Sequence, residues 1–282
     1  MKKITVIFGP TASGKSGLAL KIAEQTKGCI VNADAIQTYQ DLSLISARPQ
    51  PEETQLVPHH LYGYLDAWTQ GTVQDWLERV VPVLKEEKNP VLVGGTGLYL
   101  SSLINGINEI PTVDASVRQQ VRNMPIEEVK AKVKDCPFTD PQRLRRSLEV
   151  QLSTGKSIHY FQNQPKKMVM QADFTTIFLN PPREKLYQNC DLRFHQMIEQ
   201  GGIEEVKSLM DKKPTGGVLK AIGVPEIILY LQGNISKEDM YRQAILSTRH
   251  YAKRQITWFR HQLKADLTFM DKSDFDLAML KK

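Results

Sequence analysis

The stretch Ile4-Thr5-Val6-Ile7-Phe8-Gly9-Pro10-Thr11-Ala12-Ser13-Gly14-Lys15-Ser16 decides the fold of this chain of 282 residues. Its first five residues are apolar or β-branched and predict a buried strand. Residues 17–24 then have the apolar spacing of a helix. A strand that runs directly into a glycine-rich turn and a helix is typical of an α/β protein with a parallel sheet.

The turn itself, Gly9 to Ser16, matches the phosphate-binding pattern G-x-x-x-x-G-K-[ST]. Gly9 and Gly14 allow the backbone to wrap with its N–H groups inward, and the N-terminus of the following helix adds partial positive charge. Lys15 can then reach the terminal phosphates, and the hydroxyl of Ser16 suits a magnesium ion. A turn that matched by chance would lack the flanking strand and helix, so we expect a phosphate compound here.

The composition is ordinary for a globular enzyme, with 41% apolar and 24% charged residues. The net charge of +6 fits a polyanionic partner, although a modest excess of Lys and Arg also fits a solvated surface. Cys29, Cys136 and Cys190 form no C-x-x-C pair and predict reduced, inert thiols. Because no apolar run approaches the about 18 residues of a membrane span, we expect a cytoplasmic protein.

A carboxylate follows the second predicted strand, Cys29-Ile30-Val31-Asn32. Ligands of parallel α/β sheets bind at the carboxyl ends of the strands, so Asp34 should lie in the same crevice as the glycine-rich loop. The other apolar strands, 91–93 and 177–179, end in glycines and in Asn180. Asp34 could therefore hold a metal ion through water or act as a general base beside the phosphate site.

A second glycine-rich segment, Gly94-Gly95-Thr96-Gly97, ends the strand 90–93. It would let the backbone and the Thr96 hydroxyl approach a ligand, unless the glycines serve only strand-to-helix packing. Prolines predict loops at residues 47–53 and around Pro58, and we expect the adjacent pair His59-His60 to be structural or loop residues rather than metal ligands.

The middle of the chain changes character and predicts a small helical insertion between two core strands. We place it at residues 116–171, between the two parts of a catalytic core at 1–115 and 172–282. The core is predicted to be a parallel sheet flanked by helices, similar to that of P-loop NTPases. A further helix, from about residue 184 to residue 201, carries Arg193.

The last long helix is predicted over residues 236–263, with Ser236 and Asp239 as an approximate capping box. Four cations with spacings of seven, four and seven lie on one line of this helix, here called the basic line: Arg242, Arg249, Lys253 and Arg260. Because few acidic residues lie nearby in the sequence, like-charge repulsion favours an anionic partner for this line over a solvated helix face.

These features leave three classes of function open. The first is an enzyme that binds a phosphate or diphosphate and acts through Asp34, with a basic helix for an anionic partner. The second is a kinase of a small molecule with the insertion as a lid, which would have no use for the basic line. The third is an RNA-binding module that uses a nucleotide as a switch, but this chain lacks the second carboxylate that usually holds magnesium.

Two long blocks are more specific than the loop, Gly94-Gly95-Thr96-Gly97-Leu98-Tyr99 and residues 248–260. Shorter blocks are Asp34 with Gln37 and Tyr39, Pro58-His59-His60, residues 145–150 and Thr154-Gly155-Lys156. Together with the loop, and in this order, they resemble the bacterial tRNA dimethylallyltransferase family. The resemblance covers most of the chain up to about residue 263, although Ala35 and Gln40 replace the serine and arginine usual in the family.

The resemblance implies that the loop does not hydrolyse ATP but holds the diphosphate of dimethylallyl diphosphate. N6 of adenosine 37, next to the anticodon of tRNA, would attack the allylic carbon as diphosphate leaves. Asp34 would accept the N6 proton, and Thr96 and Arg193 would stabilise the diphosphate. The residues that bind it would be Gly9, Pro10, Thr11, Ala12, Ser13, Gly14, Lys15 and Ser16, with Mg²⁺ on Ser16.

The resemblance also implies contacts with the anticodon stem-loop of tRNA, which would give the basic line its partner. The implied contacts are Asp34, Ala35, Ile36, Gln37, Arg118, Asp140, Pro141, Gln142, Arg143, Leu144, Lys220, Gly223, Arg249, Lys253, Arg254, Gln255, Trp258 and Arg260. On this basis we expect a monomer that binds tRNA and dimethylallyl diphosphate and no membrane.

Overall fold

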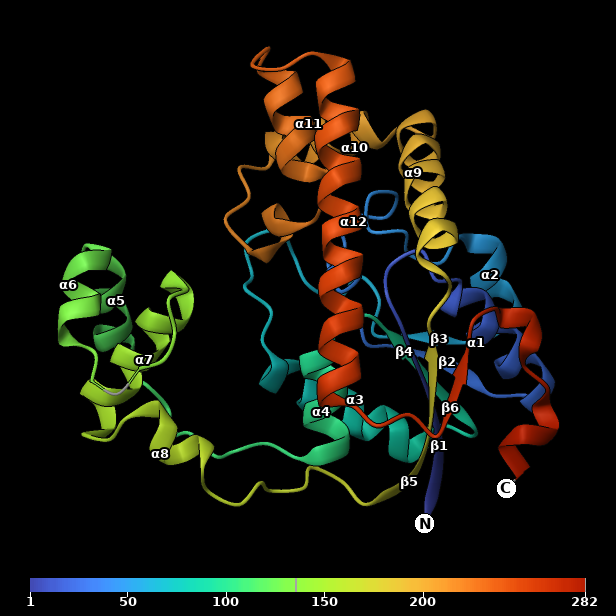
Figure 1. The fold of residues 1–282 in the computed structure, drawn as a ribbon, viewed down its shortest axis with the longest axis horizontal. Helices are drawn as coiled ribbons and strands as arrows, with labels where there is room; N and C mark the ends of the chain where they lie inside the picture. Colours follow the sequence, from blue (N-terminus) through green and yellow to red (C-terminus); the bar gives the residue numbers. More distant parts are fainter. Residues whose placement is uncertain (135, 282) are drawn as a thin grey trace. The chain divides into compact units, whose positions relative to one another are not determined.

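The computed structural model describes residues 1–134 and 136–281. Six strands of the described residues form one parallel sheet in the order β3-β2-β4-β1-β5-β6 (Figure 1). The strands are β1 Lys2–Phe8, β2 Cys29–Asn32, β3 His59–His60, β4 Pro90–Gly94, β5 Ala172–Leu179 and β6 Leu267–Phe269. The predicted α/β fold with a parallel sheet flanked by helices is confirmed.

The α-helices within these residues are α1 Lys15–Thr26, α2 Pro51–Leu56, α3 Val73–Glu86, α4 Gly97–Asn105, α5 Ala115–Asn123, α6 Ile126–Lys132, α7 Pro141–Thr154, α8 Ile158–Gln162, α9 Arg183–Glu199, α10 Gly202–Asp211, α11 Val224–Leu231 and α12 Lys237–Gln262. Short 3₁₀ helices are η1 Gly217–Lys220, η2 Lys272–Asp274 and η3 Leu277–Lys281.

Strand β1 lies in the middle of the sheet, between β4 and β5. Its last residue, Phe8, is level with Gly94 of β4 and with Phe178 of β5. The chain therefore leaves β1 at Gly9 between the ends of two neighbouring strands. Because parallel strands end at the same edge of a sheet, this edge brings the glycine-rich loop close to the segments that follow β2 and β4.

Helices cover both faces of the sheet. On one face, Leu18 of α1 belongs to the same buried cluster as Ile30 of β2. On the other face, Phe8 stacks on Phe178 with 5.2 Å between ring centroids, and its ring lies 5.0 Å from that of Phe259 in α12. The alternation of side chains along the strands thus places α1 and α12 on opposite sides of β1.

Helix α3 matches the helix that the apolar spacing of residues 72–88 predicts. Thr72 caps its first turn, and the buried indole of Trp76 donates a hydrogen bond of 2.9 Å to the carbonyl of Asn32. The same ring stacks on Tyr99 of α4 at 4.6 Å. Helices α3 and α4 therefore support the end of β2, two residues before Asp34.

Two short elements replace predicted loops. Helix α2 begins at Pro51, because proline suits the first turn of a helix, and the N–H of Gln50 donates to Glu53 at 3.0 Å. His59–His60 form the edge strand β3, which pairs in parallel with residues 30–31 of β2. The loop predictions for these residues were wrong because proline punctuation does not show whether a short segment finds a neighbouring strand.

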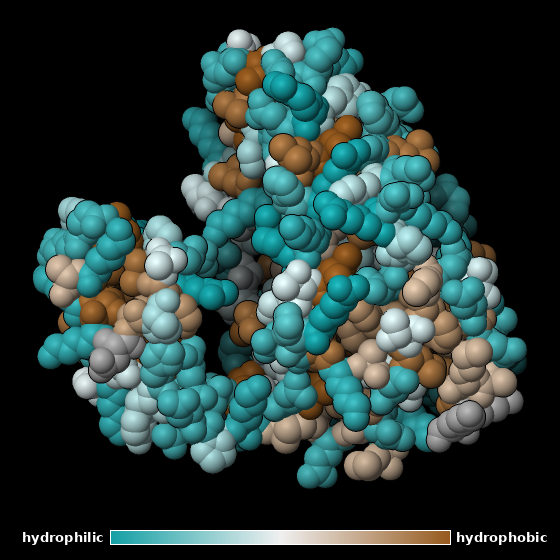
Figure 2. All heavy atoms as spheres, viewed as in Figure 1, coloured by the Kyte–Doolittle hydropathy of each residue, from teal (hydrophilic) through white to brown (hydrophobic). Residues whose placement is uncertain are grey.

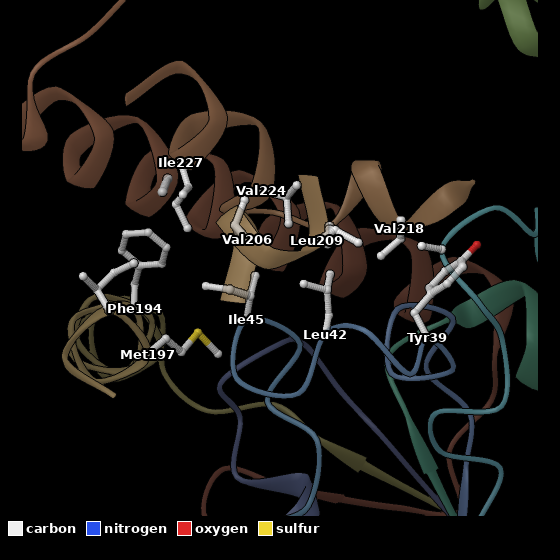
Figure 3. Packing of buried hydrophobic residues seen from close by; sticks show 14 of the residues in the cluster. Tyr39, Leu42, Ile45, Phe194, Met197, Val206, Leu209, Val218, Val224 and Ile227 are labelled. Carbon is white, nitrogen blue, oxygen red and sulfur yellow. The ribbon is translucent and has the colours of Figure 1, made fainter. Parts of the chain in front are cut away.

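A layer of helices, α9 to α12, packs onto the segment that follows β2. Leu42 and Ile45 from this segment are buried with Val206 and Leu209 of α10 and with Phe194 of α9 (Figure 3). Helices α9 and α12 also pack against each other (Figure 1). The segment that begins at Asp34 is thereby anchored to the helix that carries Arg193.

Residues 105–169 form a second compact unit. Leu148 of α7 is buried with Val121 of α5 and Val129 of α6, so these three helices form a small core of their own. Gly155 ends α7 with φ 71°, a left-handed conformation that glycine adopts without strain.

This second unit begins earlier in the chain than the predicted boundary at residue 116. Ile107 forms a bridge with Lys167, and Val113 is buried with Val150 and Phe161. The segment before α5 therefore already belongs to the unit, because its apolar side chains complete the core of the unit.

The visible surface is mostly hydrophilic, with hydrophobic residues in groups between hydrophilic ones (Figure 2). Among the described residues, no helix combines the length and the apolar character needed to cross a membrane. The three cysteines are free thiols, and Cys29 and Cys190 are buried.

Candidate active site

The loop after β1 is shaped by its two glycines. A Cβ on Gly9 would lie 2.4 Å from the carbonyl oxygen of Leu179, so only glycine fits beside the end of β5. Gly14 has φ 88° and caps α1 in the left-handed region. The side-chain amide of Asn189 in α9 donates a hydrogen bond of 3.2 Å to the carbonyl of Ala12. Helix α9 therefore fixes the outer side of the loop.

Lys15 is half-buried and lies among charged side chains. Burial lowers the pKa of Lys15 to about 8, while Asp34 opposes and Arg193 adds to that lowering. Burial also lowers the pKa of Arg193, with Cys190 and Asp34 opposing it. The Nζ of Lys15 donates to the carbonyl of Pro10 at 3.3 Å. The loop lysine, Asp34 and Arg193 thus act on one another electrostatically.

Asp34 is held by the side chain of Asn32, which is fully buried at the end of β2. The Asn32 Oδ1 accepts from the N–H of Asp34 at 2.8 Å, and its Nδ2 donates to the carbonyls of Asp34 and Leu61, each at 3.0 Å. The Asp34 Oδ1 in turn accepts from the N–H of Ile36 at 3.0 Å. This arrangement fixes the carboxylate, as a general base requires.

The second glycine-rich strand end lies directly beside Asp34. The Oδ2 of Asp34 is 3.4 Å from the position that a Cβ on Gly95 would take. The N–H of Ala35 donates to the Oγ1 of Thr96 at 2.8 Å, and the N–H of Thr96 donates to the carbonyl of Ala33 at 3.2 Å. Because the Thr96 oxygen accepts a bond, its own proton can be donated to a ligand.

Gln255 of α12 joins the two glycine-rich segments. Its Oε1 accepts from the N–H of Thr11 at 2.8 Å, and its Nε2 donates to the carbonyl of Gly95 at 2.9 Å. The side chain is only 6% exposed. The tRNA contact that the resemblance implied for Gln255 is therefore corrected, because both ends of the amide are occupied inside the protein. Its spacing from Ala252 and Phe259 on the buried face of α12 was the available signal.

The basic line on α12 is partly neutralised by acidic side chains of the protein itself. Arg249 forms a two-point ion pair with Asp191 of α9, with Nε 2.9 Å from Oδ1. Arg242 pairs with Asp239 at 2.6 Å. The expectation that few acidic residues answer this line was wrong at these two positions: Asp239 lies one turn before Arg242, and Asp191 is distant from Arg249 in sequence but adjacent in the fold. Arg249 is consequently less available to an outside anion than the sequence predicted.

Two hollows lie along the C-terminal half of α12, where the remaining cations are exposed. One of about 440 Å³ is lined by His250, Lys253, Arg254, Thr257 and Trp258. The other, of about 410 Å³, is lined by residues of α9, of α12 and of the segments that follow β5 and β6: Asn180, Pro181, Pro182, Arg183, Leu186, Tyr187, Lys253, Ile256, Thr257, Arg260 and Met270. Lys253 borders both hollows, so this half of the basic line keeps an accessible cationic surface.

Other residues with implied tRNA contacts near Asp34 and α11 differ in exposure. Ala35, Ile36 and Gln37 are half-buried. The amide of Gln37 donates to the carbonyls of residues 46 and 47, at 3.0 and 2.7 Å. Lys220 is exposed at the end of η1.

Two further positions are packed inside this unit. Gly223 is buried with φ 97°, where a Cβ would lie 3.1 Å from Phe194, so this glycine shapes the start of α11 rather than offering a side chain. Trp258 lies against Gly97, whose added Cβ would meet the indole at 2.2 Å. The implied tRNA contact at Gly223 is therefore corrected, because this glycine is buried. Trp258 is half-buried, so only part of its side chain can contact tRNA.

In the second unit, most implied tRNA contacts are exposed. Arg118 lies on the surface of α5, and Pro141, Gln142 and Arg143 lie on the first turn of α7. Asp140 caps that helix by accepting from the N–H of Arg143 at 2.9 Å. Leu144 is 4% exposed and belongs to the core of the unit. The implied tRNA contact is therefore corrected for Leu144, because its side chain is buried.

Two tyrosines near Asp34 were not singled out from the sequence. Burial raises the pKa of Tyr62 and of Tyr251, and the negative charge of Asp34 adds to both shifts. Both phenols therefore stay protonated around the carboxylate. Tyr251 lies within the block 248–260, but its place beside Asp34, like that of Tyr62, becomes visible only in the fold.

The oxygen donors at the loop fit a magnesium ion. The hydroxyl of Ser16 is exposed in the first turn of α1. The Oγ of Ser13 is buried without a hydrogen-bond partner among the described residues. Mg²⁺ prefers oxygen ligands and keeps several waters, so a hydroxyl beside bound phosphate oxygens would meet its needs.

Comparisons with known proteins agree on one kind of relative. Residues 37–262 match a family model described as IPP transferase. A tRNA dimethylallyltransferase of Rickettsia felis is 39% identical over 97% of this chain and 96% of its own length. One of Rhodopseudomonas palustris is 40% identical over 92% of this chain and 86% of its own.

Solved structures give the same result. A tRNA isopentenylpyrophosphate transferase of Bacillus halodurans superimposes with a TM-score of 0.71 at 29% identity, over 99% of this chain and 93% of that one. A eukaryotic dimethylallyltransferase, described in crystallographic snapshots as acting on tRNA, superimposes with a TM-score of 0.82 at 26% identity, over 100% of this chain and 76% of that one.

Proposed function

This chain belongs to the IPP transferase family, and from that premise we propose that it is a tRNA dimethylallyltransferase that uses dimethylallyl diphosphate. The acceptor in this proposal is N6 of adenosine 37, beside the anticodon of tRNA. The observation that carries it is the placement of Asp34 beside both glycine-rich segments, within the electrostatic environment of Lys15 and Arg193. This site offers cations for a diphosphate and one oriented carboxylate for a proton.

The cations act on the leaving group. As the bond between the allylic carbon and its oxygen breaks, negative charge grows on the diphosphate, and fixed positive groups lower the energy of that transition state. Lys15 approaches from the loop and Arg193 from α9, and the Thr96 hydroxyl has a proton to donate. Two neighbouring cations in a site withdrawn from water repel each other, so an anion between them is favoured.

Asp34 acts on the acceptor. N6 forms a bond to the allylic carbon, the carbon–oxygen bond breaks with its electron pair leaving on diphosphate, and the N6 proton passes to the carboxylate. Because Oδ1 already accepts from the N–H of Ile36 and Oδ2 faces Gly95, the Oδ2 side is the one we assign to the proton. The bond from Asn32 keeps Asp34 in this orientation.

Magnesium, held by the Ser16 hydroxyl and by diphosphate oxygens, would add positive charge to the leaving group. ATP-hydrolysing P-loop proteins typically hold magnesium with a second carboxylate at the end of a core strand. In this chain Gly95 follows β4 and Asn180 follows β5, so we assign the ion to Ser16 and the diphosphate alone.

We assign the tRNA to the exposed cations of both units. In the first unit these are Lys253, Arg254 and Arg260, which border the hollows on α12, with Lys220 on η1. In the second unit they are Arg118 and Arg143. Such contacts bind the phosphate backbone, whereas the adenine must leave the loop stack to reach Asp34, a rearrangement of a few kcal/mol.

The test is transfer without ATP. The purified protein, dimethylallyl diphosphate, Mg²⁺ and unmodified tRNA should give a prenyl mass increment on one anticodon-loop nucleoside, measured after nuclease digestion. Consumption of ATP with no mass increment would instead support a small-molecule kinase. Light scattering of the same preparation tests our further expectation of a monomer, and cell fractionation tests the expected cytoplasmic location.

A further inference from the structure

Three side chains of different chemistry meet beside strands β2 and β3. They are Cys29, the first residue of β2, His60 of β3, and Glu87, which follows α3. One sulfur, one imidazole nitrogen and one carboxylate oxygen from these residues all lie within 4.8 Å of one another. The sequence separates them by 31 and 27 positions, so the expectation that His59-His60 are not metal ligands was made without sight of this cluster.

The strand register produces this meeting. Val31 of β2 is level with His60 of β3, so the two side chains point to the same face of the sheet. Cys29 lies two residues before Val31 and shares that face, whereas Ile30 points to the α1 side. Glu87 reaches the face because α3 ends there, three residues before β4 begins.

The polar atoms of the cluster are poorly satisfied by the protein itself. The Nε2 of His60 is buried without a hydrogen-bond partner among the described residues. It nevertheless lies 3.3 Å from the Oε1 of Glu87, so the two groups are near each other without hydrogen-bond geometry. Cys29 is 1% exposed and is a free thiol. A buried nitrogen without a partner is uncommon and calls for a ligand.

We propose that Cys29, His60 and Glu87 bind one Zn²⁺ ion, which ties the edge strand β3 to β2 and to the end of α3. One sulfur, one nitrogen and one carboxylate oxygen are ligands that zinc accepts in its four-coordinate sites, whereas Mg²⁺ requires oxygen. A water molecule would complete the four ligands. The role is structural, because Cys29 begins β2 and Glu87 precedes β4, whereas Asp34 and Gly95 follow the ends of these two strands.

Glu87 lines a hollow of about 670 Å³ between the end of α1, the segment before β3 and the end of α3. Bound zinc should stabilise the edge strand β3 most, because β3 has only two residues and pairs with a neighbouring strand on one side only. Zinc binds cysteine as the thiolate, so metal binding at neutral pH should release the thiol proton.

The experiment uses the full chain stripped with a chelator and then titrated with Zn²⁺ or Co²⁺ alone. We expect about one ion per chain, a thiolate-to-cobalt charge-transfer band in the near ultraviolet, proton release, and a higher melting temperature. The variants C29S, H60N and E87Q should each weaken binding by about tenfold or more, and C29S should abolish the charge-transfer band.

Matched controls lie next to two ligands. His59 precedes His60 but bonds to the carbonyl of Val57, and Glu86 precedes Glu87. H59N and E86Q, with C190S for the other buried thiol, should bind zinc like the unaltered chain. E87Q removes only a partly exposed carboxylate, so it should fold normally. Zinc binding that is absent, or equal in E87Q and the unaltered chain, would overturn the proposal and leave His60 and Glu87 as a simple ion pair.

Discussion

Gln255 donates a hydrogen bond of 2.9 Å from its side-chain amide to the backbone carbonyl of Gly95, across 160 positions of sequence. The other end of the same amide accepts from the N–H of Thr11. One side chain of α12 therefore sets the spacing between the phosphate-binding loop and the strand end beside Asp34.

We expect Gln255→Ala to lower the free energy of unfolding by about 2 kcal/mol, because it leaves two buried backbone groups without partners. Binding of inorganic diphosphate should weaken, whereas tRNA binding should change little. Urea denaturation and calorimetry measure the two effects. Gln262→Ala, on the exposed end of the same helix, is the control. A variant that lost tRNA affinity but kept diphosphate affinity would restore Gln255 as a tRNA contact.

Replacing the carboxylate of Asp34 tests the base. Asp34→Asn keeps the shape of the side chain but removes the group that accepts a proton, so transfer should fall by about 10²–10⁴-fold. Filter binding should show nearly unchanged tRNA affinity. Asp173→Asn, at an exposed carboxylate of β5, should leave the rate unaltered. A rate in Asp34→Asn equal to that of the unaltered enzyme would remove Asp34 from this role.

The lowered pKa of Lys15 predicts how diphosphate affinity depends on pH. Below about pH 8 the lysine carries its charge before the ligand arrives; above that value it is mostly neutral and must take up a proton on binding. We therefore expect affinity to decline as the pH rises through about 8. Calorimetry in buffers of different ionisation enthalpy should show net proton uptake near that pH.

Lys15→Met should abolish both the pH dependence and the proton uptake, while Lys207→Met, at an exposed lysine of α10, should preserve them. Proton uptake that persists in Lys15→Met would assign the titration to another group.

The cations of α12 should differ in their contributions to tRNA binding. Lys253→Ala and Arg260→Ala should each weaken binding and reduce the slope of log affinity against log salt by about 1, because each removes a phosphate contact. Lys3→Ala, at an exposed lysine on the opposite edge of the sheet, controls for the loss of one charge. Unchanged slopes in both variants would make this helix face a solvated surface.

Arg249→Ala should behave differently from these two variants. Its guanidinium is paired with Asp191, so its removal should reduce the salt slope by less than Lys253→Ala does. It should instead lower stability, because it leaves Asp191 without its partner. A full unit of lost slope in Arg249→Ala would show that tRNA displaces Asp191, and the original sequence prediction for Arg249 would then hold.

Local patterns determined much of this fold from sequence. Strand β2 occupies the predicted residues 29–32, and the apolar spacing located α3 and α12 to within two residues at either end. The loop Gly9–Ser16 was predictable because glycine, lysine and serine are each required at fixed positions of a phosphate-binding turn. These features depend on neighbours in the chain, so the chain alone reveals them.

The unpredicted features depend on partners far away in the sequence. Helical spacing can show that Gln255 faces inward, but it cannot show that its hydrogen-bond partner is Thr11, 244 positions away. The row of cations was visible, while the carboxylate of Asp191 that neutralises Arg249 lies on another helix. Hydrophobic periodicity shows which face of a helix is buried, but it does not show which other element packs against that face.

The amide of Gln255 also bears on how α12 can change in evolution. Its next-door neighbour Arg254 is exposed, so adjacent codons serve the interior of the enzyme and its outer surface. In a library of all single substitutions selected for tRNA modification, the number of substitutions tolerated at each position of this helix should vary with a period of about 3.6 residues. New RNA preferences could then arise on one side of the helix while the reaction centre on the other side stays fixed.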